Sequence, residues 1–162
     1  WDGATSTIYV GDVPGQGTNW MQKLPPYQVS KNTVVYDGSD PREYFTVVGN
    51  HHTAGVELVS AYGFEDGYAL WNTNLQYNSM TFTVGHVDGS SEYNVELSVY
   101  LDGNYSTSYD LAFDSGAKTV TVPLNRAANV KFSMKPFSVQ SDGSKKYLNE
   151  VCHYGVYDIS FS

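Results

Sequence analysis

The stretch GTNWMQKLPPYQ, at positions 17–28, places Trp20 and Tyr27 among residues that favour loops. Its glycine and its adjacent Pro25 and Pro26 predict a surface segment without a helix. The prolines also stiffen the backbone, which lowers the entropy lost when a ligand docks. A sugar ring presents apolar C–H patches beside hydroxyl groups, so an aromatic ring with a polar tip suits its recognition. We therefore predict that Trp20 and Tyr27 bind a sugar.

A second stretch, ALWNTNLQYN at positions 69–78, sets amide side chains behind a tryptophan. In an extended strand, Trp71 would face one side of the sheet, and Asn72, Asn74 and Gln76 would form a row on the other side. An amide can donate and accept hydrogen bonds at once, which suits sugar hydroxyl groups. The predicted ligand-binding residues are Trp20, Trp71, Tyr27, Asn72, Asn74 and Gln76.

Both tryptophans also allow a purely structural interpretation. Trp71 can be a core indole with its amide neighbours merely solvated, and Trp20 can fold back as a lid over one end of the core. These alternatives differ from the binding hypothesis in one respect, because an indole that binds a sugar must be exposed to water. The exposure of Trp20 and Trp71 therefore decides between them.

No pattern in the sequence is typical of an active site. His51 and His52 are adjacent, so on a strand they would face opposite ways and could not hold a metal together. Cys152 and His153 are adjacent as well, and no nucleophile-elbow sequence surrounds them. Cys152 is the single cysteine, and we interpret it as a buried thiol. We predict that the chain is not an enzyme.

Most aspartates stand beside glycine or serine, where a carboxylate stabilises a turn through its own backbone. Some of them, together with backbone carbonyls, could supply the about six to eight oxygen ligands of a calcium ion. The EF-hand pattern is absent, and the sequence identifies no ligands. We expect no required cofactor, with a structural calcium as an option.

Charge and hydropathy exclude several classes of partner. Nine basic and seventeen acidic side chains give a net charge of −8, and no run of lysine or arginine could follow a nucleic-acid backbone. No stretch of about eighteen consecutive apolar residues could cross a membrane. We expect a soluble, secreted monomer, cut as a module from a longer protein with catalytic or surface domains.

Alternating apolar and polar residues predict β-strands along most of the chain. The alternation is clearest in SMTFTVGH, where Met80, Phe82 and Val84 share one face. The opening segment STIYVGD is also typical of a strand, Asp-Gly turns separate several segments, and no helical stripe occurs. We predict an all-β fold, a two-sheet antiparallel β-sandwich of the jelly-roll type with about ten strands. Residues 1–162 would form one carbohydrate-binding module.

The order of these segments resembles the NPCBM-like domains, galactose-binding-like jelly rolls that include the family 51 carbohydrate-binding modules. IYVGDV is similar to the opening strand of the family, EYFTVVGNHHTAGVEL to its segment with two glycines, and MTFTVGHVDG to a strand with its turn. NVELSVYLDGN is similar to a hairpin of the family, and KTVTVPLNRAANVKFSM to its penultimate strand pair. The closing segment HYGVYDISFS keeps an aspartate, Asp158, but lacks the tryptophan that is common there.

The resemblance implies a sugar-binding module attached to a secreted glycoside hydrolase or a surface protein. We expect it to target its parent protein to polysaccharide by aromatic stacking and amide hydrogen bonds, with plant cell-wall β-glucan or xyloglucan as the ligand. Terminal galactosides or host glycans are the alternative ligands. Two other classes stay open: a structural or adhesive β-sandwich of a surface protein, and a small hydrolase with an unrecognised site.

Overall fold

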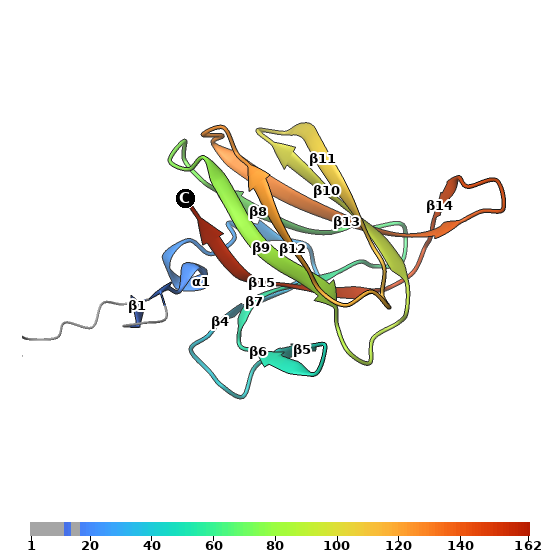
Figure 1. Cartoon of the computed structure of the whole chain (residues 1–162), viewed down its shortest axis with the longest axis horizontal. Coiled ribbons are helices and arrows are strands. Elements are labelled where there is room, and N and C mark those ends of the chain that lie inside the picture. The colour runs from blue at the N-terminus through green and yellow to red at the C-terminus, as the bar shows by residue number, and fades with distance from the viewer. Residues whose placement is uncertain (1–11, 14–16) are drawn as a thin grey trace, which may run out of the picture.

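The computed structural model describes residues 12–13 and 17–162, and this part of the chain is almost all β (Figure 1). Two antiparallel sheets pack face to face around one main core. The six-stranded sheet has the order β11 (Asn104–Leu111), β10 (Asn94–Leu101), β13 (Asn129–Val139), β8 (Gly67–Asn72) and β3 (Gln28–Val29), with β14 (Lys145–Tyr147) paired to β13. The five-stranded sheet has the order β12 (Lys118–Pro123), β9 (Ser79–His86), β15 (His153–Phe161), β7 (Ala54–Val59) and β4 (Val34–Asp37). The predicted jelly-roll sandwich is confirmed.

Smaller elements complete the described structure. β1 (Asp12–Val13) pairs with β2 (Gly17–Thr18), and β5 (Phe45–Val47) pairs with β6 (Asn50–His52). The helix α1 (Trp20–Lys23) lies at the end of the sandwich opposite to β14 (Figure 1). Within the described ranges, no helix has the length and apolar character to cross a membrane. Apart from its last residue, the predicted opening strand STIYVGD lies outside the described residues.

The helix α1 contradicts the prediction that residues 17–28 contain no helix. Asn19 begins it, because the Asn19 Oδ1 accepts a hydrogen bond from the Met21 N–H at 3.1 Å, the geometry of a helix N-cap. Pro25 and Pro26, on which the prediction rested, follow the last helical residue, so they end the helix rather than prevent it. Met21 is buried in the main core and docks this single turn on the sandwich.

The apolar side chains that alternate along β9 fill the space between the two sheets, as the sequence predicts. Met80, Phe82 and Val84 are at most 1% exposed, and the ring of Phe82 lies 4.7 Å from that of Phe132 on the opposite sheet. Burial of this apolar surface on both inner faces is the main force that holds the two sheets together.

The hairpin formed by β5 and β6 covers part of the outer face of the five-stranded sheet. Phe45 and Val47 point down onto Gly155 and Gly85, which face each other on β15 and β9. A Cβ at Gly155 would collide with the Phe45 ring, and one at Gly85 would lie 2.6 Å from Val47 Cγ1. Glycine is therefore required at these positions for the hairpin to pack.

Candidate functional site

Trp71, predicted as an aromatic platform, lies in the core. Its side chain is 0% exposed and packs on Phe132, with ring centroids 5.1 Å apart. The Trp71 Nε1 has no hydrogen-bond partner among the described residues. A ring with no free face cannot stack on a sugar, so the binding prediction is wrong for Trp71 and the structural alternative is confirmed.

The predicted row of amides behind Trp71 does not form. β8 ends at Asn72, and Asn74 adopts the left-handed conformation at φ 54°, which breaks the period of two. Thr73 is buried, and its Oγ1 donates a hydrogen bond to the Ala127 carbonyl at 2.7 Å. Asn72, Asn74 and Gln76 are all exposed. They lie at the end of a strand and on a turn, so they do not form one hydroxyl-reading line.

Trp20 covers one end of the core. Its ring is partly buried, with centroid distances of 5.6 Å to Tyr77 and 5.2 Å to Phe161. The Nζ of Lys23 lies 4.6 Å from the centroid of the same ring. This is the lid that the structural alternative describes. Neither Trp20 nor Trp71 stands uncovered, and Trp1 lies outside the described residues.

Tyr27, another predicted site residue, faces water, with 74% of its surface exposed. Its N–H donates to the Leu70 carbonyl at 2.7 Å, and the pairing of Gln28 with Leu70 continues toward the end of β8. Tyr27 and Asn72 are thus brought to the same edge of the six-stranded sheet. The other predicted residues do not join them in one site.

A pocket of about 200 Å³ opens at the β14 end of the sandwich, where β8 leaves the edge of β13 and β14 takes its place. The loop 60–66 between β7 and β8 forms one wall, and β13 with β14 forms the other. The side chains that give it chemical character are Phe64, Glu65, Asp66, Lys135, Tyr147 and Glu150. Aromatic rings and charged groups therefore share one concave surface.

The backbone of the loop 60–66 keeps the side chain of Phe64 exposed to solvent. Ala61 and Glu65 form an isolated antiparallel bridge, with N···O distances of 2.9 and 3.2 Å. The Asn149 Oδ1 accepts hydrogen bonds from the N–H groups of Gly63 and Phe64 at 2.5 and 3.1 Å. Phe64 itself is left-handed at φ 58° and is 64% exposed. Strained non-glycine residues persist where their surroundings fix them, and they cluster at ligand sites.

An acid at the end of the loop and an amine on the opposite wall lie close together. The Asp66 Oδ2 accepts a hydrogen bond from the Ser133 hydroxyl at 2.5 Å and lies 4.0 Å from the Lys135 Nζ. Lys135 Nζ in turn lies 5.5 Å from the centroid of the Tyr147 ring. These contacts restrict the side chains before any ligand arrives, which reduces the entropy lost on binding.

Tyr147 is anchored by a network on the outer face of the six-stranded sheet. Its hydroxyl donates to Glu96 at 3.0 Å, and the Lys145 Nζ donates to Glu96 and Asp110 at 2.6 Å each. The two carboxylates raise the pKa of Lys145 above its ordinary value. Burial and the Glu96 partner raise the pKa of Tyr147, so its hydroxyl stays protonated at neutral pH. The ring is 43% exposed and fixed in place.

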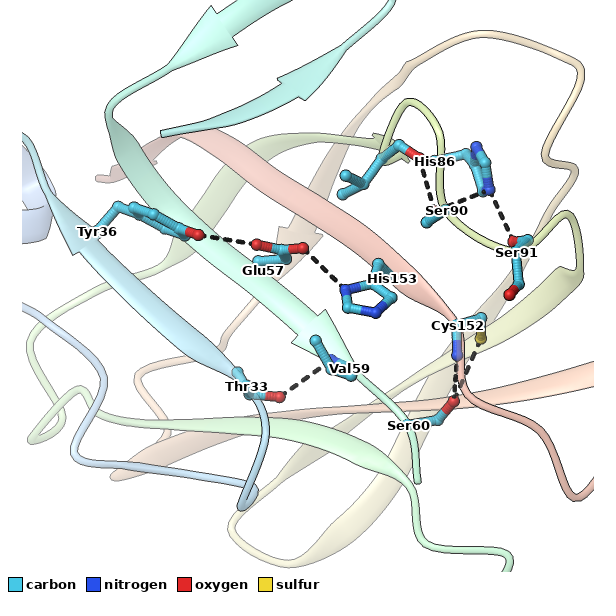
Figure 2. Close-up of polar contacts among 11 residues, drawn as sticks. Thr33, Tyr36, Glu57, Val59, Ser60, His86, Ser90, Ser91, Cys152 and His153 are labelled. Atoms are coloured by element: carbon cyan, nitrogen blue, oxygen red, sulfur yellow. Dashed lines mark hydrogen bonds and ion pairs between the residues drawn. The ribbon is translucent and has the colours of Figure 1, made fainter. Parts of the chain in front are cut away.

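A second polar cluster, shown in Figure 2, lies on the outer face of the five-stranded sheet. Glu57 accepts a hydrogen bond from the Tyr36 hydroxyl and pairs with the His153 Nδ1, each at 2.8 Å. The hydrogen bond from His153 is the main cause that lowers the pKa of Glu57.

Cys152 is buried in the main core next to this cluster. Its Sγ contacts the Ser60 Oγ at 3.3 Å, and burial raises the pKa of the thiol to about 11. Such a thiol is a poor nucleophile at neutral pH, in agreement with its interpretation as a buried thiol.

Among the residues that the structure describes, no group of three or more His, Cys, Asp or Glu side chains is placed to hold a metal ion. His51 stacks on Tyr44, with ring centroids 4.0 Å apart, and His52 stacks on Tyr157 at 3.7 Å. The two histidines thus use their rings in separate stacks.

The residues that line the pocket are not among those predicted from the sequence. The signal lies in YGFEDGY, at positions 62–68, where an apolar ring stands between two glycines and is followed by two acids. A phenylalanine in such a turn has little chance of burial, so it indicates an exposed ring. Lys135 and Tyr147 are distant in sequence, and only the pairing of β13 with β14 brings them to this loop.

No family model matches the sequence, and no curated protein matches it either. Solved structures do match. The structure is similar to the CBM51 of Clostridium perfringens GH95 in complex with methyl-galactose, with a TM-score of 0.56 and 16% identity over 88% of this chain and 97% of that chain. The chain has the fold of the family 51 carbohydrate-binding modules. The resemblance inferred from the order of the sequence segments is confirmed at this level.

Two further matches come from Clostridium perfringens ZmpB. A structure of its CBM51-2 in complex with GlcNAc and its INT domains has a TM-score of 0.57 and 15% identity, over 87% of this chain and 30% of that chain. A structure of the CBM51-2 and INT domains has a TM-score of 0.55 and 14% identity, over 84% of this chain and 29% of that chain. This chain thus spans less than a third of either ZmpB chain.

Proposed function

We propose that this chain is a non-catalytic carbohydrate-binding module and that the pocket beside Phe64 is its sugar site. The observation that carries the proposal is the pocket itself: Phe64 and Tyr147 offer apolar rings, while Asp66, Glu150 and Lys135 offer acceptors and donors beside them. Stacking on a ring with polar groups at its rim is the chemistry that a pyranose requires.

The size of the pocket favours a terminal sugar. Its volume of about 200 Å³ is below the roughly 300–1,000 Å³ typical of drug-sized sites, so it suits about one ring of a glycan. Two structures of the same fold were solved with methyl-galactose and with GlcNAc. A terminal galactoside or N-acetylhexosamine is therefore the ligand class that we propose first.

An extended chain such as plant β-glucan or xyloglucan is the second candidate. The observation that favours it is the exposed Tyr27, whose N–H donates to the Leu70 carbonyl at the edge of the six-stranded sheet. A long ligand would contact this edge rather than end in a pocket. The two candidates thus depend on different aromatic residues.

We further propose that the module serves a secreted, multimodular protein. A single stacking site gives weak binding, on the order of micromolar to millimolar, or about −8 to −4 kcal/mol. Covalent attachment to a catalytic or surface domain makes this sufficient, because tethering raises the effective concentration of ligand near the partner domain. The match covers 97% of the GH95 module, which supports the proposal that this chain forms one module of similar size.

The test compares two exposed rings. Titration calorimetry with methyl-galactoside and GlcNAc, together with affinity gels that contain β-glucan or xyloglucan, would use wild type, Phe64→Ala and, as the matched control, Tyr27→Ala. We expect Phe64→Ala to weaken binding at least about tenfold, or about 1.4 kcal/mol, and Tyr27→Ala to change it less than about twofold.

The reverse result, in which only Tyr27→Ala loses retention in the gel, would support the second candidate and would reject the pocket as the sugar site. Unchanged affinity in both folded variants would reject both sites. Release of reducing sugar during incubation with the same polysaccharides would overturn the non-catalytic assignment.

A further inference from the structure

The pocket carries more acid than base. Three carboxyl side chains line it, those of Glu65, Asp66 and Glu150, against one amine, that of Lys135. The amine is committed to Asp66, with the two groups 4.0 Å apart. Among the described residues, Glu65 and Glu150 form no ion pair with a lysine or arginine.

The remainder of the molecule adds to this imbalance. The chain has a net charge of −8, so a charged ligand approaches through a negative field before it reaches the pocket. Inside a concave site, where the walls exclude part of the water, charges interact more strongly than on an open surface. A negatively charged sugar would therefore meet two uncompensated acids beside the ring on which it has to stack.

We propose that the pocket selects by charge: it binds neutral sugars, prefers sugars that carry a free ammonium group, and rejects uronic, sialic and sulfated sugars. This inference rests on the proposed function of the same pocket. Glu65 and Glu150 are the specificity-determining residues, because their carboxylates can accept hydrogen bonds from an ammonium group with charge assistance. Phe64 supplies the stacking that neutral and charged sugars share.

The test uses three sugars that share the galacto configuration and carry no charge, a positive charge and a negative charge: methyl-galactoside, galactosamine and galacturonate. Titrations would run at pH about 6, where the ammonium form of the amine and the carboxylate form of the acid both dominate. In low salt we expect galactosamine to bind about threefold to tenfold more tightly than methyl-galactoside, and galacturonate to bind at least about tenfold more weakly. Raising the salt should compress both differences, since ions screen the charges.

Variants separate the charge of the pocket from its shape. The double variant Glu65→Gln/Glu150→Gln keeps the size of both side chains but removes their charge, so the ratio of galactosamine affinity to methyl-galactoside affinity should fall to about one, whatever the change in methyl-galactoside affinity itself. Lys135→Met should weaken galacturonate binding further. Glu43→Gln, an exposed acid outside the pocket, is the matched control and should leave the order of the three sugars unchanged.

The outcomes distinguish this inference from the function on which it rests. If methyl-galactoside binds and galacturonate binds equally well, charge selection is wrong and the sugar site stands. A preference for galactosamine that survives in the double variant would also overturn the roles of Glu65 and Glu150. If none of the three sugars binds, and GlcNAc does not bind either, both proposals fail together.

Discussion

The two ends of the sandwich use their aromatic residues in opposite ways. At the α1 end, the Trp20 ring contacts Lys23, Tyr77 and Phe161 and covers the core. At the β14 end, Phe64 is 64% exposed beside a pocket. Both rings stand in glycine-containing segments that favour turns. Local backbone contacts therefore decide whether an aromatic ring in such a segment faces water.

The backbone contacts differ in kind. The Asn19 cap begins a helical turn that carries Trp20 toward the sandwich, where burial of its indole stabilises the turn. Asn149 instead holds the N–H groups of Gly63 and Phe64, and the left-handed φ of Phe64 keeps the ring outside the core. One asparagine thus directs a ring inward and the other keeps a ring exposed.

Truncation of Trp20 should have the largest effect. Trp20→Ala removes a partly buried indole from the end of the core, and we expect the free energy of unfolding to fall by about 2–4 kcal/mol. Sugar binding by the folded fraction should be unchanged, because the pocket lies at the other end. Denaturant unfolding followed by labelling of the buried Cys152, whose raised pKa protects it in the folded state, measures the loss. If Trp20→Ala lost sugar affinity and kept its stability, the α1 end and not the β14 end would be the end that binds sugar.

The next largest effect is expected when Asn149, which caps the loop 60–66 of the pocket, is replaced. Asn149→Ala removes the acceptor of two backbone N–H groups, and we expect a stability loss of about 1–2 kcal/mol. Sugar affinity should also fall by several fold, because the Phe64 ring is no longer fixed before binding. Unfolding curves and calorimetric titrations on the same samples check both values. Asn104→Ala, which replaces an exposed asparagine at the start of β11 and outside the pocket, is the control and should leave affinity unchanged.

A smaller and opposite effect is expected from Phe64→Gly. The left-handed conformation costs a non-glycine residue about 1–2 kcal/mol, and glycine avoids that cost. Part of the gain is offset by roughly 0.4–1 kcal/mol of extra freedom in the unfolded chain. We therefore expect a gain in stability of up to about 1 kcal/mol together with loss of sugar binding. A variant that is clearly destabilised would show that the Phe64 ring packs on the fold rather than serving the pocket.

The fold was predictable from the sequence because period-two alternation and turn residues are local signals. Met80, Phe82 and Val84 face the core as their alternation requires. The site was not predictable by the same means. The pocket joins Phe64 to Lys135 and Tyr147 through strand pairing, which no local pattern encodes. Trp71 was assigned to a binding face because alternation cannot tell which side of a strand is the core when both sides hold suitable residues.

The smallest expected effect tests what covers Trp20. The Nζ of Lys23 lies 4.6 Å from the centroid of its ring, and a cation over an indole at the surface contributes about 0.5 kcal/mol. Lys23→Met keeps the length and apolar stem of the side chain but removes the charge, so stability should fall by about that amount. Acrylamide quenching of the tryptophan fluorescence should rise only slightly, because Tyr77 and Phe161 still contact the Trp20 ring. The double variant Trp20→Phe/Lys23→Met, measured in the same way, gives the contribution of the other tryptophans. A large rise in quenching would mean that the lysine alone shields the indole, and the α1 end would then present an aromatic ring as readily as the pocket presents Phe64.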